Sequence, residues 1–167
     1  MDNMKRMTRD EKVQDIALAY IRKHAMDKPW ERTVMGELHP YIGKRLQLEQ
    51  GELVVVSAYF SEDSWYAFTT RRIVSKFGGT FYSIDPSAGI SGNFGIFKGG
   101  GGKSREVATL TPQCSDQVIK FEFVTGAESM LPIYAERYWN IKHRALDKLV
   151  TSAERQEITR RRRVEGQ

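Results

Sequence analysis

Apolar residues follow three successive patterns along this 167-residue chain. Over residues 8–26 they recur at helical spacing, at Val13, Ile16, Ala17, Tyr20 and Ile21. Thr8 followed by Glu11 three residues later is a capping box, which signals the start of a helix. Pro29 ends this helix, and we expect a second, shorter helix over residues 30–38. The first part of the chain therefore predicts helices that pack on the sheet or form an arm that binds a partner.

The pattern changes from helical to extended at about residue 52, where β-branched and aromatic residues become frequent. Turn sequences such as SEDS, DPSAG and GGGGKS separate the extended runs. We expect about seven strands, over residues 53–60, 65–69, 73–77, 80–84, 92–97, 106–110 and 117–124. Short strands at this density predict an antiparallel meander that closes toward a sandwich or a partly open barrel.

A helical pattern returns in the last third of the chain. One apolar stripe contains Leu131, Tyr134, Tyr138, Ile141, Ala145 and Leu149, and Pro132 is tolerated in the first turn. The final residues are polar and have little to bury. We therefore expect an α+β protein in three parts: an N-terminal helical segment (1–48), an antiparallel domain capped by a long C-terminal helix (49–150) and a basic polar tail (151–167).

Composition suits one core and excludes several classes of protein. At 40% hydrophobic residues the chain can bury one core, but no run approaches the roughly 18 apolar residues of a membrane helix. The N-terminus has no apolar signal core, so we expect a cytoplasmic protein. Cys114 is the single cysteine, and with three scattered histidines it forms no metal-ligand pattern. We expect neither a metal nor a cofactor.

The stretch FKGGGGKSREV, residues 97–107, raises the question of a phosphate-binding loop. Such a loop requires a glycine where this chain has Phe97, and it leads into a helix, whereas Ser104 leads into a strand-like run. We interpret the stretch as a flexible hairpin tip. Its cations attract an anion only loosely; they are Lys98, Lys103 and Arg105.

The net charge is +5 and the excess lies mostly near the C-terminus, where residues 126–167 hold nine Lys/Arg against six Asp/Glu. Four consecutive arginines stand there: Arg160, Arg161, Arg162 and Arg163. Such a run clamps phosphates, binds an anionic lipid surface or forms a solvated tail. No aromatic residues are interleaved with it, which favours the solvated tail.

Residues 65–76, WYAFTTRRIVSK, have the order strand, threonine turn, arginine, strand. Within them YAFTTRRI resembles the pattern Y-A-L-T-x-R-R-hydrophobic of bacterial pleckstrin-homology-like proteins, and YSIDPSAGIS and GNFGIFKG resemble that family's next strands. The resemblance covers about residues 50–148 and implies a seven-strand sandwich or partly open barrel capped by a helix. The scaffold carries lipid-binding, peptide-binding and structural roles, so the resemblance alone selects no function.

Two interpretations of this hairpin stay open. In the first, a threonine hydroxyl bonds to the turn backbone and Arg71 or Arg72 pairs with a carboxylate such as Glu62 or Asp63. In the second, Arg71, Arg72 and Lys76 form a basic ledge for an acidic ligand. The first is the commoner use of such residues in a turn.

No sequence motif in this chain indicates a particular enzymatic reaction. His24, His39 and His143 each lie on or beside an apolar helical segment with no catalytic pattern around them, so we expect a protein that is not an enzyme. The charge-balanced, aromatic-rich strand region favours a protein-binding module of bacterial or phage type, acting as an immunity protein, an inhibitor or an adaptor on one partner. The alternative is a nucleic-acid or anionic-surface binder that works through the arginine tail and the basic loop.

Overall fold

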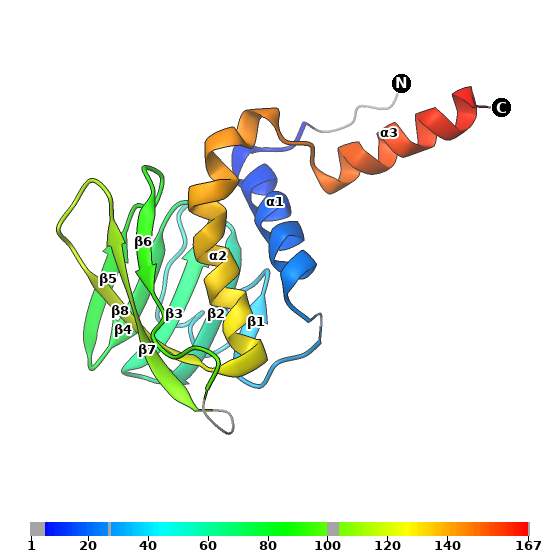
Figure 1. Ribbon diagram of the computed structural model, residues 1–167. Coiled ribbons are helices and arrows are strands. Elements are labelled where there is room, and N and C mark those ends of the chain that lie inside the picture. The colour runs from blue at the N-terminus through cyan, green and yellow to red at the C-terminus, as the bar shows by residue number, and fades with distance from the viewer. Residues whose placement is uncertain (1–5, 27, 100–103, 167) are drawn as a thin grey trace.

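The computed structural model describes residues 6–26, 28–99 and 104–166 (Figure 1). The elements follow in the order α1 (Arg9–His24), β1 (Thr33–Met35), β2 (Val54–Ser61), β3 (Ser64–Thr69), β4 (Ile73–Phe77), β5 (Thr80–Ile84), β6 (Ile90–Asn93), β7 (Arg105–Pro112), β8 (Ile119–Val124), η1 (Gly126–Ser129), α2 (Met130–Ile141), η2 (His143–Lys148) and α3 (Ser152–Glu165). The elements η1 and η2 are 3₁₀ helices.

The strands form two antiparallel sheets in an α+β fold. One sheet has five strands in the order β1-β2-β3-β4-β5, and the other has three in the order β6-β7-β8. The strand β8 lies against β3, β4 and β5, so the two sheets face each other across the core. They remain two sheets and do not close into one barrel.

Aromatic side chains fill the space between the sheets. Tyr66 and Phe68 from β3 meet Phe121 from β8, with ring centroids 4.6 Å and 5.9 Å from that of Phe121. All three are fully buried. The outer face of β3 is buried as well, because Ile42 and Leu46 pack there on Trp65, Ala67 and Val74. The segment between β1 and β2 thus gives the larger sheet a second apolar layer.

Helices α1 and α2 lie side by side along the sandwich (Figure 1). The helix α2 packs on β2 and β6 as well as on α1. Val13, Ile16 and Ile21 of α1 belong to the same apolar cluster as Leu131 and Trp139 of α2. The N-terminal helix therefore shares one core with the sheets.

The prediction of a helix over residues 30–38 is wrong. Thr33–Met35 forms the strand β1, whose Thr33 stands opposite Ala58 of β2. Two β-branched residues and Gly36, at φ 81°, make this segment a poor helix. Pairing with the edge of β2 supplies its backbone hydrogen bonds instead. With β1 the structure has eight strands rather than seven.

The C-terminal helix is present, but it is shorter than expected and is followed by two separate helical segments. The helix α2 ends at Ile141, and the apolar stripe continues in η2, where Ala145 leaves helical geometry at φ −106° and ψ 15°. A capping box formed by Thr151 and Glu154 then starts α3 as a separate helix. No residue of α3 is buried, and it extends away from the sandwich (Figure 1). Within the described ranges, no helix is long and apolar enough to span a bilayer.

Two aliphatic side chains on either side of this junction should respond differently to truncation. Leu146 is 2% exposed and belongs to the core, so Leu146→Ala is expected to lower the free energy of unfolding by about 2 to 5 kcal/mol. Ile158 of α3 is 41% exposed, and Ile158→Ala should change it by about 0.5 kcal/mol or less. Urea unfolding of both variants measures the difference. A large loss in Ile158→Ala would show that α3 packs on the body of the protein.

Candidate functional site

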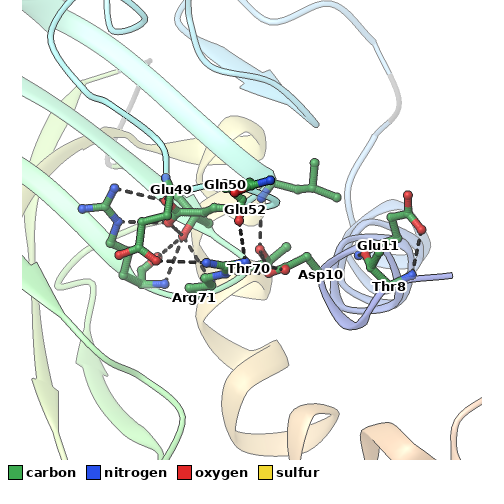
Figure 2. A network of polar contacts seen from close by, with 11 residues as sticks. Thr8, Asp10, Glu11, Glu49, Gln50, Glu52, Thr70 and Arg71 are labelled. Atoms are coloured by element: carbon green, nitrogen blue, oxygen red, sulfur yellow. Dashed lines mark hydrogen bonds and ion pairs between the residues drawn. The ribbon is translucent and has the colours of Figure 1, made fainter.

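Arg71 lies in a polar network that joins α1 to the β3-β4 turn (Figure 2). Its guanidinium donates to both carboxylate oxygens of Asp10, at 3.1 and 2.9 Å, and to Glu49 at 3.0 Å. It also donates to the carbonyl of Gln50 at 2.9 Å. The Arg71 guanidinium holds the pKa of Asp10 below its ordinary value, although partial burial opposes the shift.

Arg72 makes a second, more buried pair with Glu52. The guanidinium donates to the two carboxylate oxygens at 2.9 and 3.1 Å, and the Thr69 hydroxyl donates to the same carboxylate at 2.6 Å. The Glu52 side chain has no exposed surface. Burial raises the pKa of Glu52, but the hydrogen bonds from Arg72 and Thr69 outweigh it and lower the pKa overall.

The turn chemistry expected for the hairpin is present, but its acidic partners differ from those expected. The Thr69 hydroxyl accepts from the backbone N–H groups of Arg71 and Arg72. Glu62 pairs instead with Arg45 at 2.8 Å, and Asp63 lies 3.8 Å from Lys76. Each of the three cations in the expected ledge, Arg71, Arg72 and Lys76, therefore faces a carboxylate of the same chain.

The glycine-rich tip and the start of β7 hold three further cations, Lys98, Lys103 and Arg105. Lys98 is exposed, and Lys103 lies outside the described residues. Arg105 lies 3.6 Å from Glu122 of the neighbouring strand and over the ring of Phe60, 5.0 Å from its centroid. Arg105 thus contacts one residue of each sheet.

The four-arginine run occupies the last turns of α3. Arg160 and Arg161 both pair with Glu157, at 2.7 and 3.1 Å. In the part of the chain that the structure describes, Arg162 and Arg163 make no ion pair, and both are exposed. The run thus divides into an internally paired half and an unpaired half.

A cleft of about 560 Å³ lies between β6 and α2 and is here called the β6-α2 cleft. Its walls include Gly92, Phe94 and Phe97 on one side and Ile133, Tyr134 and Glu136 on the other. Ile141 also lines it and is 56% exposed, and Ile96, adjacent in sequence to Phe97, is 72% exposed. The cleft combines apolar walls with exposed aliphatic side chains.

The polar side chains of this cleft include those of Asn93, Glu136, Arg137 and Asn140. Glu136 is 8% exposed, and burial raises its pKa to about 7 while Arg137 opposes the shift. The Asn140 amide donates to Glu136 at 3.2 Å and to the carbonyl of Ile90 at 2.7 Å, and its oxygen accepts from the N–H of Ile90 at 2.9 Å. Asn140 therefore covers the free edge of β6 at Ile90.

The three histidines each lie next to an aromatic side chain. His24 stacks on Tyr134 with centroids 4.2 Å apart, and His39 stacks on Tyr59 at 5.4 Å. The His143 ring nitrogen Nδ1 lies 2.9 Å from the Tyr138 hydroxyl. Among the described residues, no three His, Cys, Asp or Glu side chains are grouped to hold a metal ion.

Comparison of the chain with protein-family models, curated proteins and solved structures yields no match.

Arg72→Ala should destabilise the protein more than Arg71→Ala. Loss of Arg72 leaves the buried carboxylate of Glu52 without its bidentate partner, which we expect to cost about 3 kcal/mol of the free energy of unfolding. The ion pairs of Arg71 lie at the surface, where water screens them, so its loss should cost less. Chemical unfolding of both variants tests the order. Equal losses would contradict the assignment of Glu52 and Arg72 as the stronger pair.

Glu136→Gln should stabilise the protein above neutral pH. The folded-state pKa near 7 exceeds the unfolded value of about 4.3, so wild-type stability falls as the pH rises from about 4.3 through 7. Glutamine cannot ionise and should remove that fall. Unfolding free energies measured between about pH 4.5 and pH 8.5 give the slope, with the exposed Glu165→Gln as control. An unchanged slope in Glu136→Gln would refute the raised pKa.

Proposed function

We propose that the protein is a non-enzymatic protein-binding module and that the β6-α2 cleft receives its partner. The observation that carries this proposal is an open cleft whose walls include Phe94, Tyr134 and the exposed Ile141. A second exposed isoleucine, Ile96, is adjacent in sequence to Phe97 of the cleft wall. Apolar side chains exposed around a concave surface are typical of protein-interaction sites. The arginines of the β3-β4 turn favour this proposal over binding of an acidic ligand, because carboxylates of the same chain already neutralise their charge.

An extended segment of the partner fits the β6 side of the cleft. Residue Ile90 points its N–H and C=O toward Asn140, away from β7. Backbone groups of an antiparallel strand alternate in direction, so those of Gly92 point to the same side as those of Ile90. Gly92 lines the cleft and has no side chain to cover them. A partner strand can pair there, while its side chains contact Phe94, Tyr134 and Ile141.

We further propose that the fold is pleckstrin-homology-like. The residues that resemble that family form the β3-β4 hairpin with its threonine and arginine turn. Seven strands, β2 to β8, precede the helix α2, which packs on both sheets through β2 and β6. The strand β1 and the helix α1 are additions to this layout.

The role we propose is that of an inhibitor, an immunity protein or an adaptor that acts on one partner. Each of these roles requires a surface complementary to the partner and no catalytic residues. A cytoplasmic location belongs to the same proposal, and it is supported by Cys114, a free and exposed thiol of the kind that reducing compartments preserve.

A pull-down with matched variants tests the cleft. Wild-type protein should retain one stoichiometric protein from native lysate after nuclease treatment and at raised salt. The double variant Ile96→Glu/Ile141→Glu should lose it, because it places two charges where apolar surface is buried. The control Phe81→Glu changes another exposed residue, on β5, and should retain the partner.

Two results would reject the proposal. Retention by the double variant would remove the cleft from the interface. Loss of the captured protein on nuclease treatment would show that nucleic acid, rather than the cleft, holds it.

A further inference from the structure

The charged side chains of α3 are separated on two sides of the helix. With 3.6 residues per turn, Ser152, Arg155, Thr159, Arg162 and Arg163 fall within an arc of about 100°. The acidic residues Glu154, Glu157 and Glu165 fall within an arc of about 80° on the other side. One face of α3, here called the basic face and defined by Arg155, Arg162 and Arg163, is therefore free of carboxylates of its own helix.

The arginines of the basic face are available to a ligand. Arg155, Arg162 and Arg163 are exposed, and within the described ranges none makes an ion pair. Beside them, Arg160 is held in place by Glu157 at 2.7 and 3.0 Å. Arg155, Thr159, Arg160 and Arg163 line a hollow of about 540 Å³ along this side of the helix. The hollow is open, is lined by three arginines together with Val164, and is formed by α3 alone.

We propose that the basic face of α3 binds the phosphate backbone of a double-stranded nucleic acid. Guanidinium groups donate paired hydrogen bonds to phosphate oxygens, and three of them on one helix face give a sequence-independent attraction. The helix is about 21 Å long and projects from the body (Figure 1), and the major groove of B-form DNA, about 12 Å wide, admits an α-helix. This function is separate from that of the β6-α2 cleft.

The side chains of α3 favour a duplex over other anionic partners. A membrane-surface helix requires an apolar stripe, but Ile158 and Val164 lie about 120° apart around α3. Single strands are held largely by stacking on aromatic rings, and α3 contains none. An acidic protein surface would bury apolar anchors that this helix does not provide. Of the anionic partners considered, a duplex bound through contacts between arginine and phosphate fits the side chains of α3 best.

Salt dependence of binding tests the proposal directly. Fluorescence anisotropy would follow labelled DNA and RNA duplexes of about 20 base pairs at salt concentrations from about 50 to 200 mM. The triple variant Arg155→Gln/Arg162→Gln/Arg163→Gln should bind each duplex roughly tenfold or more weakly. Its slope of log affinity against log salt should fall in magnitude by about 2 to 3. Because α3 buries no residue, the variant should fold normally, and circular dichroism verifies this.

A control variant separates the basic face from net charge. Arg22→Gln/Lys44→Gln/Lys120→Gln removes the same charge from exposed positions elsewhere and should bind like the wild type. The cleft variant Ile96→Glu/Ile141→Glu should lose no more affinity for the duplexes than its two added negative charges explain. Equal losses in the triple variant and the charge control would overturn the proposal. Single strands bound as tightly as duplexes would do the same, as would anionic phosphatidylserine vesicles bound more tightly than either duplex.

Discussion

The arrangement of the chain depends on the pairing of one buried charge, the carboxylate of Glu52, whose side chain has no exposed surface. It accepts hydrogen bonds from Arg72 and Thr69 of the β3-β4 turn and from the backbone N–H of Glu49. A buried charge is tolerated only when it is paired and hydrogen-bonded, so this site permits little variation in the position of the turn. The neighbouring Thr70 hydroxyl donates to Asp10 at 2.6 Å and extends the network to α1. Because α1 packs beside α2, the network also helps to place the helix that forms one wall of the cleft.

The same network explains how a basic protein has a sandwich with little free positive charge. Acidic side chains from α1 and from residues 49–52 neutralise the turn arginines, and Glu122 faces Arg105. The helix α3, beyond the last buried residue of the body, carries five arginines against three glutamates. The molecule thus separates an apolar, charge-balanced surface from a cationic one, and the two differ in the chemistry they can recognise.

Local signals allowed much of the fold to be predicted from the sequence. The capping box of Thr8 and Glu11 marks α1, and glycine and Asp-Pro turns bound β5, which was expected at residues 80–84. The strand β1 was missed because three residues are too few to show the alternation of apolar and polar positions that marks a strand. Its partner β2 also begins about twenty residues later in the sequence. The break at Ala145 was missed because the apolar stripe continues through it.

The site was less accessible to prediction than the fold. The hairpin identified Arg71 and Arg72, but their partners Asp10, Glu49 and Glu52 are distant in sequence and are brought near only by packing. The β6-α2 cleft depends on two elements that pack against each other across a connection of more than thirty residues. The i, i+4 spacing of Glu136 and Asn140 was a visible signal, but its meaning depends on the facing strand.

The junction before α3 has a mechanical consequence. Leu149 is extended, Thr151 starts a new helix with its own cap, and a hydrogen bond from the N–H of Ser152 to Asp15 at 2.8 Å ties that start to α1. This tie holds only the start of α3, so a small change in the backbone torsions of residues 149–151 would swing the whole basic face relative to the sandwich. The direction in which the arginines point is therefore set at this junction and not by packing along the helix.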